Sequence, residues 1–386
     1  MENLKKLTAF SLAVAMLAAF SGCGDQTWSY RTKDVSLSAG TYIFNLMNGY
    51  YEAYGMVDTP DEVDDILKEE VTDSDKDVTK TVEQFALDSA DEDTLKMVAV
   101  EDIFKKNNLK LDTDDTALAE TYVGQVWSTM KQTCEKYGIS EESFNYCYVE
   151  APAKSEKVFE FLYGKDGSEA VSDDALIEYY KDKYTGYAYF SLSMTDYDDE
   201  GNAVPKSDAE VKKAEENFKA YADMINNDKK SYKDAVLKYT EDYDLSSDPT
   251  YSGSYNKEDS TLTEAVTAPL DNLKEGQAEF VKSGEGEDAI YYLVYKPVTD
   301  DIIDFLDDED DDSSDVVETS DTASAETEIY DLKTGYSRSS LLEEMKSDDF
   351  ADYLKNYASG IGVEKNPAIV DKFKPKLFVK DDDEED

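Results

Sequence analysis

The spacing of hydrophobic residues changes near Tyr187 of this 386-residue chain, and this change constrains the fold more than any other feature. Before Tyr187, apolar side chains recur every three or four positions, as at Tyr42, Leu46 and Tyr50. This period predicts a series of amphipathic helices. From Tyr187 to Met194, side chains alternate with the period of a half-buried strand. The sequence therefore predicts a helical region followed by a region that contains a sheet.

The second region has two predicted strands that enclose two predicted helices. The strands are residues 187–194 and 290–297, while residues 211–225 and 232–239 each carry one apolar helical face. Another helical face returns at 342–357. This order predicts an α+β fold, in which a β-α-α-β module is inserted into a mostly helical chain.

The first 23 residues predict export and attachment to a membrane. Lys5 and Lys6 precede an apolar run at 7–20, which is shorter than the roughly 20 residues that span a bilayer. A small pair, Ser21-Gly22, then marks the cleavage site of a signal peptide. Cys23 resembles the lipid-accepting cysteine of a bacterial lipobox, which implies a protein anchored by lipid to the outer face of the cell membrane. An ordinary signal peptide that is cut near an unmodified cysteine is the alternative.

The chain is strongly acidic, with 89 acidic and 39 basic residues and a net charge of −50. Such a charge excludes nucleic acid as a partner, because binding nucleic acid requires basic groups that neutralise phosphates. Residues 300–328 hold fourteen acidic residues and no basic one, which predicts a solvated, disordered linker. The whole chain is 40% hydrophobic, so its body is expected to fold.

Histidine is absent from the chain. Its absence excludes catalysis by Ser-His-Asp or Cys-His and zinc sites with histidine ligands. Cys134 and Cys147 are the only cysteines after Cys23, too few for a thiolate metal site. Two buried free thiols are favoured for this pair, and a disulfide is the alternative. The sequence therefore predicts neither a metal nor a cofactor.

One acidic segment begins like a calcium-binding loop. Asp196, Asp198 and Glu200 are spaced as in an EF-hand, and Gly201 follows them. The twelfth position is Ser207, where an EF-hand requires a glutamate that binds with both oxygens. A hairpin or a strand-to-helix turn is therefore favoured over a calcium site.

The order of the predicted parts resembles that of extracytoplasmic foldases of the PrsA and SurA type. The resemblance covers most of residues 42–378. Its local marks are the junction at 171–184, the strand at 291–294 and the C-terminal segment at 363–376. In the family, a helical chaperone domain is built from sequence on both sides of a parvulin-like prolyl isomerase module. The resemblance implies a SurA-like helical domain and an inserted parvulin-like domain here.

Within the module, three segments carry the resemblance. Residues 231–242 are similar to the family's second helix and the acidic position after it, and 273–277 match the step before the last strands. Residues 252–255 occupy the place of the family's glycine-rich turn.

The resemblance also implies positions for site residues. The family's two core histidines correspond here to Tyr189 and Tyr292, its Cys or Asp position to Asp242, and its proline-pocket Phe to Leu270. A phenol cannot replace an imidazole near neutral pH, so prolyl isomerase activity is expected to be weak or lost. The alternative for Tyr189 and Tyr292 is that they are ordinary half-buried aromatic residues of strands.

These observations predict the following division of the chain. The expected parts are a signal peptide at 1–22, a tether at 23–37, a helical chaperone domain at 38–184, a parvulin-like domain at 185–298, an acidic linker at 299–334, a C-terminal helix and tail that packs on the chaperone domain at 335–379, and an acidic tail at 380–386.

The expected function is that of a lipid-anchored chaperone that binds unfolded or newly secreted polypeptides. The first alternative keeps this fold but makes the module an active peptidyl-prolyl isomerase. The second alternative is an acidic surface lipoprotein that binds a small ligand or calcium and has no role in folding.

Overall fold

The structure is a computed structural model that describes residues 27–379, except 61, 62, 64, 74–77, 199, 248, 259, 260, 304–331 and 333. Cys23, most of the acidic linker and the acidic tail lie outside the described residues. The chain divides into two compact units. We call them the helical unit, Met1–Ala170 with Lys346–Asp386, and the sheet unit, Val171–Met345. The fold is mixed α+β, which confirms the predicted class.

The helical unit is formed by segments from both ends of the chain. Its strands are β1 (Trp28–Arg31), β2 (Ser36–Ser38), β3 (Glu70–Asp73), β4 (Val78–Thr81) and β11 (Glu364–Lys365). Its helices are α2 (Ala39–Gly55), η3 (Ile66–Lys68), α3 (Val82–Lys106), α4 (Asp114–Tyr137), α5 (Glu141–Asn145), the π-helical turn η4 (Tyr146–Glu150), α6 (Ala151–Tyr163), α13 (Pro367–Val370) and η6 (Pro375–Phe378). Helix α12 (Arg338–Gly360) begins in the sheet unit and ends in the helical unit.

Helix α2 follows from its sequence. The side chain of Ser38 caps the helix by accepting a hydrogen bond of 3.0 Å from the backbone N–H of Thr41. The predicted face is buried: Tyr42, Leu46 and Tyr50 are each at most 2% exposed. These residues pack against α3 and the residues around it, and they form the centre of the helical unit's core.

Strand β1 joins the two ends of the chain in one antiparallel sheet of order β11-β1-β2. Tyr30 on β1 is fully buried, and its hydroxyl donates a hydrogen bond to Asp91 of α3. Lys365 on β11 binds the same carboxylate. The backbone N–H of Asn366 donates to the carbonyl of Ser29 over 2.8 Å. The C-terminal segment is therefore held to the first described strand.

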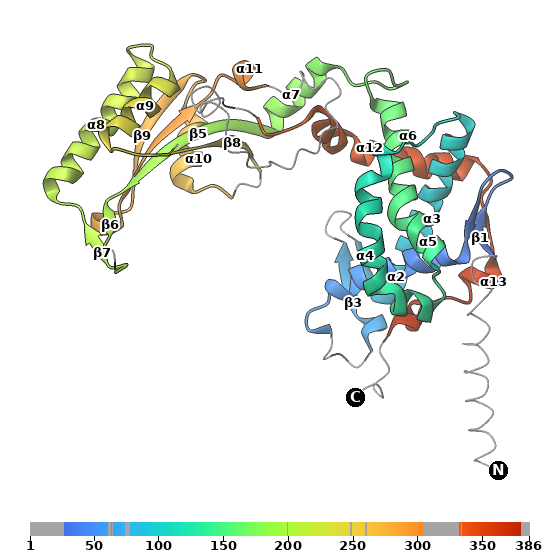
Figure 1. The fold of residues 1–386 in the computed structure, drawn as a ribbon. Coiled ribbons are helices and arrows are strands. Elements are labelled where there is room, and N and C mark those ends of the chain that lie inside the picture. The colour runs from blue at the N-terminus through green and yellow to red at the C-terminus, as the bar shows by residue number, and fades with distance from the viewer. Residues whose placement is uncertain are drawn as a thin grey trace. The chain divides into compact units, whose positions relative to one another are not determined.

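The sheet unit contains one four-stranded antiparallel sheet of order β8-β5-β10-β9 (Figure 1). Its strands are β5 (Tyr184–Ser193), β8 (Thr250–Asn256), β9 (Gln277–Ser283) and β10 (Ile290–Lys296), and a separate hairpin is formed by β6 (Thr195–Tyr197) and β7 (Ala203–Pro205). Its helices are α7 (Asp173–Lys183), α8 (Asp208–Asn226), α9 (Tyr232–Asp242), α10 (Glu264–Asn272), η5 (Gly286–Asp288) and α11 (Thr299–Ile302).

The two predicted strands of the module pair as expected, with Phe190 of β5 opposite Leu293 of β10. Helices α8 and α9 lie on one side of this sheet, and α10 lies on the other (Figure 1). Phe190 and Leu293 point to the α8–α9 side and are fully buried there. Because side chains alternate along a strand, their neighbours point to the α10 side.

Several segments differ from the sequence-based expectation. Residues 28–37, predicted as part of a tether, contain β1 and most of β2, because Tyr30 and Leu37 are buried in the core. Residues 252–255, predicted at the place of a turn, belong to the edge strand β8.

Cys134 and Cys147 are both buried and are not joined by a disulfide, as the sequence favoured. Burial raises the pKa of the Cys134 thiol, and the neighbouring charge of Glu135 adds to the effect. Both effects keep the thiol protonated near neutral pH, which makes Cys134 a core residue rather than a nucleophile.

Candidate functional site

Five tyrosines share the α10 side of the sheet. Two of them lie on β5, two on the edge strand β8 and one on β10, and we call this group the tyrosine face: Tyr187, Tyr189, Tyr251, Tyr255 and Tyr292. The strand period places them together, because residues i and i+2 on a strand point to the same side. The register places Tyr251 directly opposite Tyr189.

Tyr189 is the centre of the tyrosine face. Its ring stacks on that of Tyr251, with centroids 5.1 Å apart and planes 17° from parallel. The ring of Tyr187 stacks on its other side at 6.1 Å, and the ring of Tyr292 lies 5.9 Å away in a tilted arrangement. These separations are in the range where aromatic pairs attract each other, so each ring restricts its neighbours.

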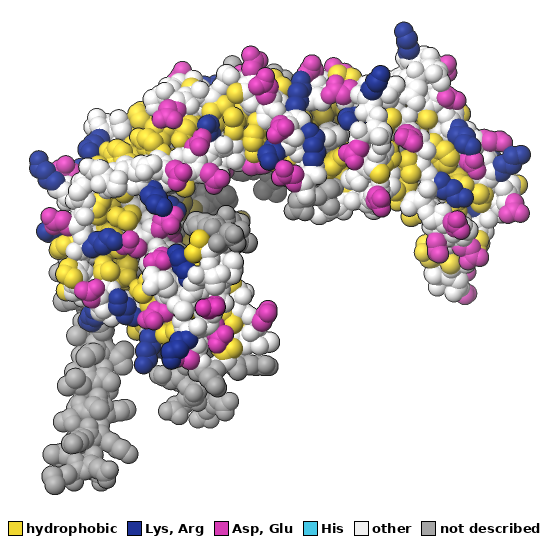
Figure 2. All heavy atoms as spheres, turned by 180° about the vertical axis from the view of Figure 1, so that it is seen from behind, with side chains coloured by type: hydrophobic (Ala, Val, Ile, Leu, Met, Phe, Trp, Pro, Cys, Tyr) yellow, Lys and Arg dark blue, Asp and Glu magenta, His cyan; other side chains and the backbone are white. Residues whose placement is uncertain are grey.

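Exposure of the rings increases toward the edge strand. Tyr292 is 9% exposed, and it packs with Leu270 of α10, which is fully buried. Tyr189 and Tyr187 are half-buried. Tyr251, on β8, is 59% exposed. The face therefore has a buried apolar base beside α10 and an accessible aromatic edge. Hydrophobic side chains also reach the surface of both units among scattered charges (Figure 2).

Burial keeps three phenols of this face uncharged near neutral pH, those of Tyr187, Tyr189 and Tyr255. Burial raises the pKa of both Tyr187 and Tyr189 above the ordinary value of 10.0, and for Tyr189 the neighbouring phenols raise it further. A neutral phenol can donate or accept a hydrogen bond. It is a poor general base at neutral pH, where an imidazole would be effective. The chemistry of the face therefore suits binding better than proton transfer.

The structure brings three of the predicted site residues together and separates the fourth. Tyr189, Tyr292 and Leu270 belong to one cluster on the α10 side. Asp242 ends α9, on the other side of the sheet. Its carboxylate accepts a hydrogen bond of 2.7 Å from Tyr221 of α8, whose ring belongs to the core there. The catalytic and pocket roles given to these residues stay predictions, but Asp242 has no place on the tyrosine face.

Tyr187, Tyr251 and Tyr255 were not selected from the sequence. The match of residues 252–255 to the family's turn hides the alternation of the surrounding segment. Tyr251, Gly253 and Tyr255 are spaced by two, which is the period of one side of a strand. That spacing was the signal that could have revealed the face.

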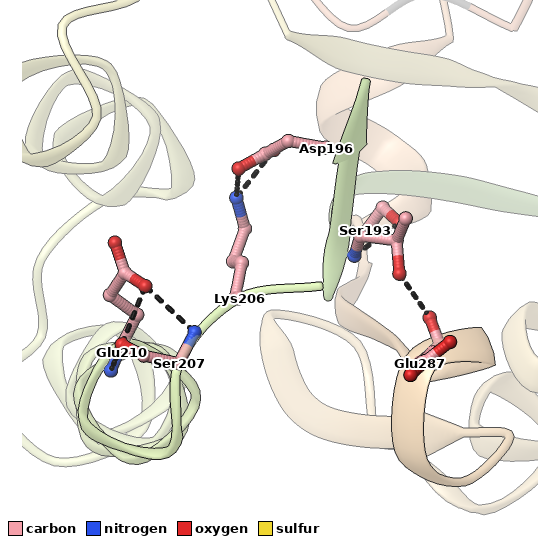
Figure 3. Close-up of polar contacts among 7 residues, drawn as sticks. Ser193, Asp196, Lys206, Ser207, Glu210 and Glu287 are labelled. Atoms are coloured by element: carbon pink, nitrogen blue, oxygen red, sulfur yellow. Dashed lines mark hydrogen bonds and ion pairs between the residues drawn. The ribbon is translucent and has the colours of Figure 1, made fainter. Parts of the chain in front are cut away.

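The calcium-like segment forms most of the β6–β7 hairpin. Lys206 forms an ion pair with Asp196 of β6 at 2.5 Å (Figure 3). Asp198 accepts hydrogen bonds from the backbone N–H groups of Glu200 and Asn202, at 2.9 and 2.8 Å. Ser207 begins α8 in a capping box with Glu210. The predicted hairpin is therefore confirmed, and Asp196 and Asp198 both bind partners within this segment.

Among the described residues, no group of three or more acidic or cysteine side chains is arranged to hold a metal ion. The same part of the chain contains no helix with the length and apolar character needed to cross a membrane.

Comparisons with known proteins give a distant structural similarity. No family model matches the chain, and no curated protein matches it. Among solved structures, the chain is similar to the crystal structure of the foldase protein PrsA from Streptococcus pneumoniae. The two are 12% identical, the match covers 80% of this chain and 99% of that one, and the TM-score is 0.25. The function proposed below rests on the residues of this chain.

Proposed function

We propose that this protein is a folding factor that binds non-native polypeptides and that the tyrosine face is its binding site in the sheet unit. The observation that carries the proposal is a group of five tyrosines in ring contact on one side of a sheet, from the buried Tyr292 to the exposed Tyr251. Helices α8 and α9 cover the opposite side, so the α10 side is the one with aromatic rings at its surface.

Such a surface suits extended segments with apolar or proline side chains. Aromatic grooves recognise proline-rich segments by contact with the ring, since such segments lose little entropy on binding. Tyrosines give a large contact area with few rotatable bonds, and their hydroxyls can bond to the backbone of a bound chain. Recognition of this kind depends on ring contacts and not on one particular peptide sequence. A folding factor needs this property, because it binds polypeptides of many sequences.

The location of this activity is a second part of the proposal. The leader and Cys23 support a lipid-anchored protein at the outer face of a bacterial cell membrane. The order of parts supports a SurA-like helical domain with a degenerate parvulin-like module. The net charge of −50 favours polypeptide partners over nucleic acid.

We expect the protein to bind proline-containing peptides without accelerating their isomerisation. The chain has no histidine, and burial raises the pKa of Tyr187, Tyr189 and Tyr255, so these three phenols stay protonated near neutral pH. A protease-coupled assay on a prolyl tetrapeptide should give the uncatalysed rate, which has a time scale of tens of seconds. A faster rate that is lost in Tyr189→Phe would instead establish an active isomerase.

Tyr251→Ala tests the binding site itself. We expect this variant of the full chain to suppress the aggregation of a chemically unfolded client less well, with an affinity about fivefold to tenfold weaker. Its stability should change by less than about 1 kcal/mol, because the ring is 59% exposed. Light scattering of the client, measured against protein concentration, gives the comparison.

Tyr197→Ala is the matched control, because this ring is 74% exposed and lies on the hairpin strand β6. It should suppress aggregation as the unmodified chain does. Tyr251→Phe should also retain the effect if ring contact drives binding. Equal loss in the Tyr197 and Tyr251 variants would contradict a binding site on the sheet.

A further inference from the structure

The helical unit has an open hollow of about 290 Å³ in its surface. It lies between α4 and α5, and its lining includes Val123, Gly124, Trp127, Glu141, Glu142 and Phe144. Sites for small molecules have volumes of about 300–1,000 Å³ and enclose most of the ligand. This hollow is at the lower limit and open, so its size suits one or two side chains of a bound polypeptide.

The floor of the hollow is aromatic. Trp127 and Phe144 are 7% and 2% exposed, and their ring centroids are 5.2 Å apart. Tyr148 stacks on Phe144 at 5.4 Å and is itself 38% exposed. The floor therefore offers ring contacts to a large apolar side chain, and these contacts favour burial of that side chain over its exposure to water.

Gly124 keeps the hollow open. It lies inside α4, where a glycine is less favourable than an alanine. A Cβ atom at this position would meet no other atom within 4 Å, so packing does not require the glycine. Because Gly124 lines the hollow, any larger side chain there would occupy the hollow.

The rim of the hollow is acidic. Glu141 and Glu142 begin α5 and are both exposed. In the part of the chain that the structure describes, neither carboxylate forms an ion pair. Two carboxylates next to an aromatic floor favour a partner that carries positive charge next to an apolar side chain. A second copy of this chain does not fit that description, because its net charge is −50.

We propose that the hollow binds basic polypeptide segments, with one large apolar side chain on the Trp127–Phe144 floor and flanking Lys or Arg side chains beside Glu141 and Glu142. The site lies in the helical unit and is separate from the tyrosine face, which recognises its partner through uncharged rings. It gives the protein a preference among polypeptides that depends on charge. The net charge of the chain extends the attraction over distances comparable to the Debye length.

Trp127 reports on the site directly. The chain has two tryptophans, and Trp28→Phe leaves Trp127 as the only one. The probe is a synthetic peptide in which two leucines are flanked on each side by two lysines, and its twin carries glutamates in place of the lysines. We expect a saturable change in Trp127 emission with the lysine peptide and none with its twin. Equal binding of both peptides, or no change with either, would overturn the proposal.

Two variants locate the binding. Gly124→Leu should weaken the affinity for the lysine peptide about tenfold or more, because its side chain fills the hollow. Its melting temperature should not fall, because leucine favours a helix. Gln125→Leu adds the same side chain at an exposed position that does not line the hollow, and it should bind normally. An unchanged affinity in Gly124→Leu would exclude the hollow as the site.

Further variants test the acidic rim and distinguish the hollow from the tyrosine face. Glu141→Gln combined with Glu142→Gln should weaken binding about fivefold at low salt, and the difference should shrink as salt is added. Tyr251→Ala should leave the Trp127 signal unchanged. Loss of the signal in Tyr251→Ala would show that the hollow is no separate site, whereas failure of the aggregation assay alone would affect the tyrosine face only.

Discussion

Phe190→Ala is expected to destabilise the sheet unit by about 3–5 kcal/mol, the usual cost of removing a fully buried phenylalanine ring. Phe190 is 0% exposed, and its ring stacks on that of Tyr239 with centroids 4.4 Å apart. It also meets Phe218 and Tyr221 edge-on, at 5.6 and 5.8 Å. The substitution removes the ring that joins β5 to both α8 and α9. Urea unfolding followed by near-ultraviolet circular dichroism measures the loss.

Hydrogen exchange shows which of the two units the Phe190 variant destabilises. Hydrogen exchange should quicken in β5 and β10 of the Phe190 variant and stay unchanged in α2, whose core does not include Phe190. Tyr251→Ala, on the same sheet but 59% exposed, is the control that should lose less than about 1 kcal/mol. Equal acceleration in α2 would show that the chain unfolds as one cooperative body.

Asp242→Ala is expected to cost about 1–3 kcal/mol, because it leaves the buried hydroxyl of Tyr221 without its acceptor. Tyr221 is 1% exposed and donates to Asp242 over 2.7 Å. Lys238 donates to the same carboxylate over 2.8 Å. The peptide-binding properties of the tyrosine face should not change. If Asp242→Ala kept its stability but lost peptide binding, Asp242 would instead be a residue of the binding site.

Asp242→Asn isolates the charge, because the amide oxygen can still accept from Tyr221. Burial alone would raise the pKa of Asp242, but hydrogen bonds from Lys238 and Tyr221 and the charge of Lys238 outweigh it and lower the pKa below 3.8. A depressed pKa in the folded state stabilises the protein above the unfolded pKa, which is about 3.9. This stabilisation is lost as pH falls through the folded pKa.

The free energy of unfolding, measured by urea titration at several pH values, checks this sign. Asp242→Asn should be less stable than the unmodified chain by a constant amount above about pH 5. The difference should shrink below about pH 4 and vanish once the carboxyl is protonated. A difference that grows toward low pH would contradict the lowered pKa.

Local periods in the sequence predicted those elements whose burial is one-sided. Tyr42, Leu46 and Tyr50 repeat at helical spacing, and all three are buried in α2. The strand predicted at 187–194 overlaps β5, along which buried residues alternate with half-buried ones. Such patterns can be interpreted without knowing which element packs against the helix or strand, because the spacing of its own apolar residues shows which side is buried.

Pairings that join distant segments could not be predicted in this way. The edge strand β8 contains Ser252 and Gly253, and its place in the sheet depends on β5 rather than on its own composition. Its assignment to a turn concealed Tyr251, the most exposed ring of the tyrosine face. Asp242 was placed by its position in a motif, but α9 extends to this residue and directs it toward Tyr221.

The pairing of β1 with β11 determines the order in which the units can be completed during synthesis. Arg31 and Glu364 lie 333 positions apart and are partners in the same sheet. A ribosome therefore finishes the whole of Val171–Met345 before the strand that closes the helical unit exists. Closing so long a loop is slow, since its entropic cost precedes any gain from the contacts. The sheet unit is thus ready to fold first, and the helical unit waits for the last residues of its own chain.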